Sequence, residues 1–165
     1  MYRPMFAAAW AASMKIYDAK NPLAKVADVI GGAIATNIRT VDEKYRWKNT
    51  CAVRMSYILN QTGSRIPKLR DTVSGADGMN YFYRVKDLRA YLERTWGAAR
   101  QVDFPPSGGG PLAGKQGVIL FAVSGWSDAG GHATLFNGIT CYDNCYFNEP
   151  EANYRTDSAY FWSLS

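Results

Sequence analysis

The spacing of apolar residues changes along this chain, and the change limits the folds that it can adopt. Before residue 97 the apolar residues recur every three or four positions, as in Phe6, Trp10 and Met14, which is the period of a helix. After residue 116 they gather in short runs that are typical of strands. Helices followed by a group of short strands indicate an α+β domain, in which the helices pack on a small antiparallel sheet.

The boundaries of the expected elements follow from these patterns and from the residues that break them. Helices are expected near residues 4–17, 22–30, 50–61 and 86–96. Strands are expected near residues 117–123, 132–137, 141–147 and 159–164. The segments between them that are charged or rich in glycine and proline are expected to be loops, namely residues 39–48, 67–78 and 98–114.

Length and composition indicate one folded unit. A chain of 165 residues that is 47% hydrophobic can bury a sizeable core, so residues 1–165 are expected to form a single domain. The net charge of +5 is spread along the chain, which favours anionic partners only weakly and gives no sign of a nucleic-acid site. No window of about 18 apolar residues occurs, so no membrane insertion is expected.

The N-terminal stretch allows two interpretations. Residues 5–14 are rich in alanine and resemble a short signal peptide with small residues at its end. However, Phe6, Trp10 and Tyr17 lie at helical spacing, with Lys15 on the other side. We therefore expect this stretch to be the first helix of the domain.

The three cysteines fall into a single residue and a pair. Cys141 and Cys145 are four residues apart and can close a small disulfide loop if the backbone turns, or they can remain two half-buried thiols. Cys51 is left without a partner. Because the chain has one histidine and no second cysteine pair, a structural zinc site is not expected.

Cys51 and the only histidine, His132, are the candidates for chemistry. Imidazole is the side chain whose ordinary pKa suits proton transfer near neutral pH, and a thiolate is stabilised in the first turn of a helix. A cysteine that opens a helix, then a histidine that starts a strand, then a polar residue on the next strand is the order in papain-like cysteine hydrolases. Asp143, beyond the turn at residues 137–138, is the candidate third member.

Each of these residues also has an ordinary structural interpretation. Cys51 could be a small buried apolar residue, His132 a hydrogen-bonded core histidine, and Asp143 a turn residue. Their joint order along the chain favours the catalytic interpretation over the three separate ones. The alternative is retained as a non-catalytic, basic module that binds wall polymer or nucleic acid.

The surroundings of a cysteine nucleophile would include donors for an oxyanion. The backbone N–H of Cys51 is the natural first donor, and the Asn49 side chain is a possible second one. Trp126 is expected to form a wall of the cleft. Asp77 lies in a run typical of turns and is expected to be a turn or cap residue.

Five stretches, taken together and in this order, resemble the fourth family of type VI secretion amidase effectors. They are residues 50–60, 73–77, 125–127, 131–138 and the Cys141-x-Asp143-x-Cys145 motif. The resemblance covers nearly the whole chain, from Arg3 to the aromatic final strand. The loops at residues 41–48 and 104–114 align with the family only loosely.

The resemblance implies an NlpC-type papain-like fold and a peptidoglycan DL-endopeptidase. Such an enzyme cuts the amide between γ-D-glutamyl and meso-diaminopimelate in stem peptides. Within the family pattern, Cys51 is the nucleophile, His132 the base and Asp143 the third member, held inside a disulfide between Cys141 and Cys145. No metal or organic cofactor is implied.

The resemblance also implies partners and a place of action. The type VI secretion machinery would carry the protein from the producer's cytoplasm into the periplasm of a rival, and a cognate immunity protein would block the cleft. Neither nucleic acid nor a membrane is an implied partner. The same Cys-His-Asp order also serves acyltransferases, transglutaminases and deamidases, which are the enzymatic alternatives.

Overall fold

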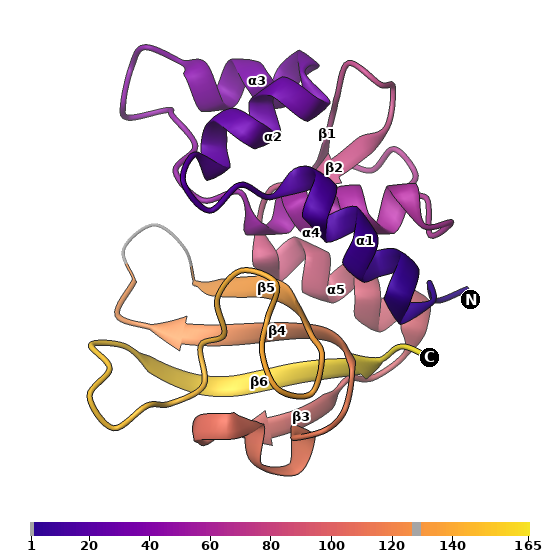
Figure 1. Ribbon diagram of the computed structural model, residues 1–165. Coiled ribbons are helices and arrows are strands. Elements are labelled where there is room, and N and C mark those ends of the chain that lie inside the picture. Colours follow the sequence, from indigo (N-terminus) through magenta and orange to yellow (C-terminus); the bar gives the residue numbers. More distant parts are fainter. Residues whose placement is uncertain (1, 127–129) are drawn as a thin grey trace.

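A computed structural model describes residues 2–126 and 130–165, and in it the helices cover one face of a four-stranded antiparallel sheet (Figure 1). The helices are α1 (Phe6–Ile16), α2 (Pro22–Ile30), α3 (Gly32–Arg39), α4 (Cys51–Gln61) and α5 (Val85–Trp96), with a 3-10 segment η1 (Ser107–Leu112). The strands are β1 (Thr72–Ser74), β2 (Asn80–Phe82), β3 (Arg100–Asp103), β4 (Gly117–Ser124), β5 (Gly131–Phe136) and β6 (Arg155–Ser163). The α+β prediction is confirmed.

The main sheet has the strand order β3-β6-β4-β5, while β1 and β2 form a separate hairpin. Because successive side chains of a strand point to opposite faces, β4 serves two cores. Val118 and Leu120 pack in the cluster shared with the helices, whereas Ile119 and Phe121 pack in a second cluster on the other face. This double burial explains why the sequence of β4 is a continuous apolar run.

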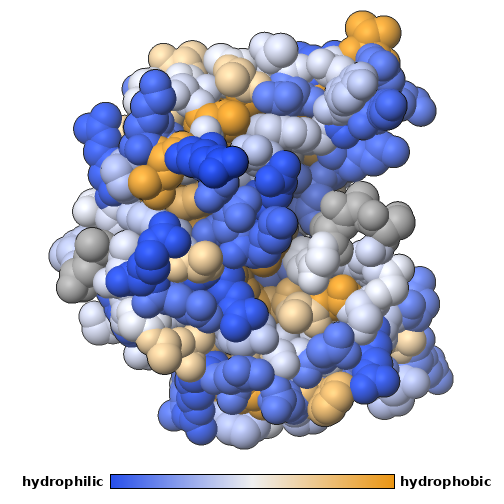
Figure 2. Space-filling model, turned by 180° about the vertical axis from the view of Figure 1, so that it is seen from behind, coloured by the Kyte–Doolittle hydropathy of each residue, from blue (hydrophilic) through white to orange (hydrophobic). Residues whose placement is uncertain are grey.

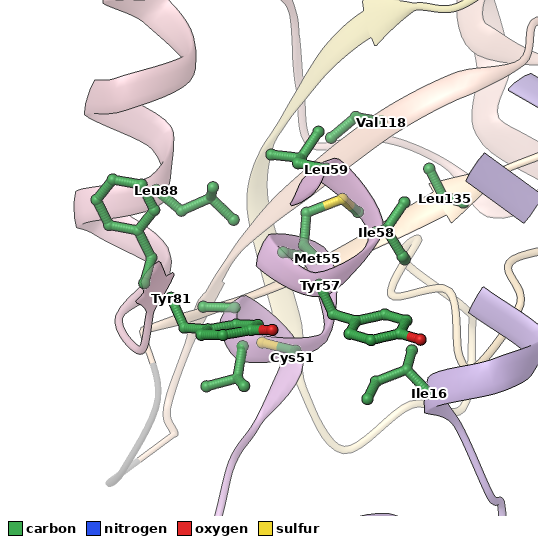
Figure 3. Close-up of a cluster of buried hydrophobic side chains, with 14 of the residues drawn as sticks. Ile16, Cys51, Met55, Tyr57, Ile58, Leu59, Tyr81, Leu88, Val118 and Leu135 are labelled. Carbon is green, nitrogen blue, oxygen red and sulfur yellow. The ribbon is translucent and has the colours of Figure 1, made fainter. Parts of the chain in front are cut away.

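Helix α4 lies at the centre of the larger cluster. Its residues from Cys51 to Asn60 are all buried, because α1, α5, β2 and β5 surround it. Figure 3 shows Met55 and Ile58 of α4 close to Leu135 of β5, with Cys51 at the end of the helix where the chain enters. The packing therefore fixes the first turn of α4 against the sheet.

The two chain ends lie side by side (Figure 1). The Phe6 N–H donates to the Ser165 carbonyl at 2.8 Å, and the Arg3 guanidinium donates to the carbonyls of Ser163 and Trp96. The N-terminal stretch is thus the helix α1 that its spacing predicts. No helix of the described residues is long and apolar enough to span a membrane.

Several segments differ from the sequence-based expectation. Strand β1 lies within the predicted loop 67–78, where it pairs with β2. Helix α3 follows α2 directly, with Gly31 at φ 65° between them, because Ile34 and Ile38 supply another buried face one turn apart. Strand β3 and η1 lie within the predicted loop 98–114, since β3 pairs with β6 through its backbone and needs no apolar pattern. The connection between the predicted strands 117–123 and 132–137 includes residues 127–129, which lie outside the described residues.

The predicted strand at residues 141–147 is wrong. Only Cys141 forms a bridge, to Phe136, and the Tyr142 N–H donates to the Leu135 carbonyl at 3.3 Å. Beyond this point the backbone pairing stops, and a disulfide joins Cys141 to Cys145. The segment is therefore a loop that runs along the free edge of β5 for two residues.

Candidate active site

Cys51 is the first residue of α4 and its side chain is buried at the junction of helix and sheet. Thr50 occupies the N-cap position, but its hydroxyl accepts a hydrogen bond from Arg54 instead of capping the helix. The cap is supplied by Asn49, whose Oδ1 accepts the Cys51 N–H at 3.0 Å. The backbone donor that was expected for an oxyanion is thus occupied by Asn49 in this structure.

His132 lies near the start of β5, the edge strand beside α4. Its imidazole acts on the Cys51 thiol at close range, because each of the two groups shifts the pKa of the other. The ring of Tyr146 meets the imidazole edge-on, with 4.8 Å between centroids, and Trp126 meets Tyr146 in the same way. These aromatic contacts hold the imidazole on the helix N-terminus.

Asp143 reaches His132 from the loop along β5. The distance between Asp143 Oδ2 and His132 Nε2 is 2.9 Å, which is an ion-pair contact, although the ring N–H is not aligned for a hydrogen bond. The other carboxylate oxygen accepts from Thr134 Oγ1 and from the Asn144 N–H, both at 2.6 Å. The Cys141–Cys145 disulfide encloses Asp143. The structure therefore brings the three predicted site residues together.

The electrostatics of the three groups favour a charged pair. Burial by itself raises the pKa of Cys51, but the hydrogen bond and charge of His132 lower it below the ordinary value. Burial also opposes charge on His132, yet Asp143 and Cys51 raise the pKa of the imidazole to about 9. Burial likewise raises the pKa of Asp143, but His132 and Arg54 lower it overall. A thiolate, an imidazolium and a carboxylate are the expected forms near neutral pH.

Arg54 is a site residue to which the sequence analysis assigned no role. It lies one turn after Cys51, and its Nη2 donates to Asp143 Oδ2 at 2.9 Å with only 8% of the Arg54 side chain exposed. Its other nitrogens donate to Thr50 Oγ1 and to the Tyr142 hydroxyl. A charged residue on a helix that is otherwise buried is the signal that could have identified it, because buried charges are nearly always paired.

Two hollows lie on either side of the site. The larger, of about 740 Å³, is lined by Cys51, and the smaller, of about 340 Å³, is lined by His132 and Trp126. Lys48 and Asn49 line both. Trp126 is thus on the wall of a cleft, as expected, and an extended ligand that crosses the site would occupy both hollows.

Two remaining expectations concern a turn and metals. Asp77 Oδ1 accepts the Met79 N–H and Oδ2 accepts the Tyr81 hydroxyl, so Asp77 is a turn residue away from the site. Within residues 2–126 and 130–165, no group of three or more histidine, cysteine or acidic side chains could hold a metal ion.

Comparisons with known proteins give one family. The family model described as type VI secretion system (T6SS), amidase effector protein 4, matches residues 47–162. The crystal structure of the Tae4–Tai4 effector-immunity complex from Enterobacter cloacae contains a chain that is 38% identical, with 99% of this chain and 100% of that chain covered and a TM-score of 0.86. The crystal structure of the Tae4–Tai4 complex from Salmonella Typhimurium contains a chain that is 37% identical, with 99% of this chain and 100% of that chain covered and a TM-score of 0.84. No curated protein matches the chain.

Proposed function

This chain belongs to the family of type VI secretion amidase effectors known as Tae4, and from this premise we propose that it hydrolyses the amide between γ-D-glutamyl and meso-diaminopimelate in peptidoglycan stem peptides. As a member of that family it is a hydrolase that acts on peptidoglycan. The observation that carries the proposed mechanism is the connected arrangement of Cys51, His132 and Asp143 at the N-terminus of α4.

In the first half of the reaction, the Cys51 thiolate attacks the γ-carbonyl carbon of the glutamyl residue. The carbon–nitrogen bond breaks, and the His132 imidazolium gives its proton to the leaving amine of diaminopimelate. A thioester between Cys51 and the glutamyl residue remains. Asp143 stays ionised and holds the imidazole in place throughout.

In the second half, the neutral imidazole of His132 takes a proton from water, and the resulting hydroxide attacks the thioester. The carbon–sulfur bond breaks, which releases the glutamyl carboxyl group and restores the thiolate–imidazolium pair. No step uses a metal or an organic cofactor.

The developing oxyanion needs donors near Cys51. We propose that the substrate oxygen replaces Asn49 Oδ1 as the acceptor of the Cys51 N–H, and that the Asn49 amide NH₂ then serves as the second donor. The support is the present 3.0 Å bond between these two residues, because the Asn49 side chain lies beside the Cys51 N–H.

The whole chain is proposed to act as one catalytic unit. Cys51 comes from the helical part, whereas His132 and Asp143 come from the sheet and its edge loop. One buried cluster includes residues of both parts, among them Met55 of α4 and Leu135 of β5. Neither part by itself holds the complete site.

Digestion of Gram-negative sacculi by the purified protein, followed by mass spectrometry of the fragments, tests this proposal. Wild-type protein should release peptides that begin with diaminopimelate, and Cys51→Ala should release none. Ser64→Ala, which removes a hydroxyl that bonds the Tyr2 carbonyl and lines neither hollow, is the control. Equal digestion by Cys51→Ala and wild type would rule out the cysteine mechanism.

The enzymatic alternatives use the same thioester and differ in the acceptor that resolves it. In an acyltransferase or transglutaminase an amine replaces water, and in a deamidase the substrate is a side-chain amide. Adding glycine amide to the digestion distinguishes them, because a transferase would yield a conjugated glutamyl product. Hydrolysis predicts the free carboxylate in both conditions.

The proposal includes partners and a place of action. Effectors of this family are delivered into target cells, and we propose that this protein acts in the periplasm, where the peptidoglycan of a Gram-negative target lies. The related structures are complexes of Tae4 with Tai4 immunity proteins. We propose that a cognate immunity protein likewise covers the hollows beside Cys51 and His132.

A further inference from the structure

The position of His132 orients a substrate in the two hollows. Under the proposed mechanism the leaving amine takes its proton from His132, so it must lie on the side of the smaller hollow, which His132 lines. The acyl part of the substrate then extends into the larger hollow, which Cys51 lines. This orientation places the glutamyl residue, and not diaminopimelate, in the larger hollow.

The larger hollow is strongly cationic. Six basic side chains line it, namely Lys44, Arg46, Lys48, Arg84, Lys86 and Arg89, against the single carboxylate of Glu43. Figure 2 shows hydrophilic residues gathered around a hollow between the helical part and the sheet.

Several of these cations already have partners. Arg46 donates to the carbonyls of Thr40 and Val41, and Arg89 forms an ion pair with Glu93 at 2.9 Å. Lys48 and Lys86 form no ion pair with any residue that the structure describes. Arg84 reaches Asp87 only at 3.9 Å. Lys44 likewise has no ion pair within the described residues, but its ammonium lies over the ring of Tyr45, 5.5 Å from the ring centre. Lys48, Lys86 and Arg84 are therefore the cations that we consider for an anionic ligand.

Two of these available cations directly follow aromatic residues whose rings stack on each other. The rings of Trp47 and Tyr83 are stacked, with centroids 5.0 Å apart and planes inclined by 13°. Lys48 and Arg84 directly follow these aromatic residues, and the Arg84 guanidinium lies 4.9 Å from the centre of the Tyr83 ring. The stack fixes one wall of the hollow and limits where the two cations can lie.

We propose that Lys48, Arg84 and Lys86 bind the free α-carboxylate of the γ-linked glutamyl residue and so make the enzyme selective for it, an inference that rests on the proposed function. In a γ-linked glutamyl residue this carboxylate sits on the third carbon from the scissile carbonyl, within the larger hollow. Isoglutamine, in which the same carboxyl group is amidated, lacks the charge.

The test compares two synthetic tetrapeptides that differ only in this group, L-Ala-γ-D-Glu-meso-diaminopimelate-D-Ala and its D-isoglutamine counterpart. Because a hydrogen bond to a charged group contributes more than one to a neutral group, wild-type kcat/KM should be at least about tenfold higher for the free acid. The variant with Lys48→Gln, Arg84→Gln and Lys86→Gln together should lose most of that preference.

The ratio of the two kcat/KM values separates recognition from a structural effect, because a damaged fold slows both substrates alike. A matched control replaces three exposed cations that line neither hollow, as Arg65→Gln, Lys68→Gln and Lys115→Gln, and should keep the wild-type ratio. Equal rates for both peptides in the wild type, or an unchanged ratio in the hollow variant, would overturn the inference.

Calorimetry of both peptides with the inactive Cys51→Ala protein tests the inference without catalysis. Tighter binding of the free acid than of the isoglutamine peptide supports it, and equal binding contradicts it. If the wild type cuts neither peptide, the proposed hydrolysis fails, while the binding experiment still decides the role of the three cations.

Discussion

At the scale of single residues, Arg54 is the side chain that most changes the description of the site. Arg54 Nη2 and His132 Nε2 lie at the same distance, 2.9 Å, from the same oxygen of Asp143. The guanidinium therefore favours the ionised form of the carboxylate. It also shares Oδ2 with the imidazole, so the negative charge of Asp143 interacts with two cations at once. Its positive charge further lowers the pKa of Cys51.

Replacing Arg54 tests this role. Arg54→Met breaks a buried ion pair, so the free energy of unfolding should fall by about 3–5 kcal/mol. Because the positive charge near Cys51 is lost, the acid limb of the kcat/KM profile should move to higher pH, and Arg54→Lys should move it back in part. Urea unfolding and pH-rate profiles measure the two effects. Lower stability with an unmoved acid limb would restrict Arg54 to a structural role.

The pH dependence of the wild-type enzyme follows from Cys51 and His132. The reactive pair needs an ionised thiol, whose pKa is lowered, and a protonated imidazole, whose pKa is raised to about 9. Activity should therefore be level across neutral pH and fall as the pH rises through the pKa of His132. Alkylation of Cys51 by iodoacetamide at about pH 7 should be fast. Slow alkylation would favour the non-catalytic, buried interpretation of Cys51.

At the scale of elements, the sequence pattern predicted the segments that contribute many apolar side chains to the two buried clusters. Helices α2, α4 and α5 begin and end within a few residues of the expected positions. Strand β3 could not be predicted, because it joins the sheet by backbone pairing with β6 and exposes most of its side chains. Helix α3 was missed because the two glycines before it indicate a stop and do not show that a helix restarts.

The candidate site also combines features that the sequence predicted with features that it did not. The order of Cys51, His132 and Asp143 along the chain was enough to predict that they meet. The expected strand around Asp143 was wrong, yet two residues of edge pairing and a disulfide place this carboxylate in the same position. The contacts of Arg54 and Tyr146 depend on side-chain packing between distant segments, for which the sequence has no local pattern.

A pair of neighbouring glycines tests how strand β5 positions His132. A Cβ at Gly131 would lie 2.3 Å from the Phe121 carbonyl oxygen of β4, whereas a Cβ at Gly130 would meet nothing within 4 Å. Gly131→Ala should therefore separate β5 from β4, with a loss of about 1–3 kcal/mol in unfolding free energy and a larger loss of activity, because His132 follows directly. Thermal unfolding and sacculus digestion measure both.

Gly130→Ala is the matched control for this prediction. It adds the same methyl group one residue earlier without a clash, so it should leave the stability close to that of the wild type, although Gly130 itself lines the larger hollow. If the two variants behaved alike, the close approach of β4 and β5 at Gly131 would not be what places His132.

At the scale of the whole molecule, the site is a junction between two parts of the chain. Cys51 and Arg54 belong to α4 in the helical part, while His132 and Asp143 belong to the sheet and its edge loop. The ion pair of Arg54 with Asp143 is nearly fully buried, with 8% and 1% of the two side chains exposed. This ion pair joins the helical part to the sheet, and it requires the charged form of Asp143. The stability of the fold should therefore depend on pH through the ionisation of Asp143.

The sign of this effect follows from the lowered pKa of Asp143. A carboxyl group whose pKa is lower in the folded protein stabilises the fold fully above its ordinary pKa of about 4, and loses that contribution as the pH falls through the folded value. The difference in unfolding free energy between wild type and Asp143→Asn includes the lost effect of Asp143 on the pKa of His132, and it should shrink as the pH falls below about 4. Urea unfolding of both proteins at matched pH measures it. Since every other carboxyl group is shared, a difference that stayed constant to about pH 2 would mean that Asp143 does not link the two parts through its charge.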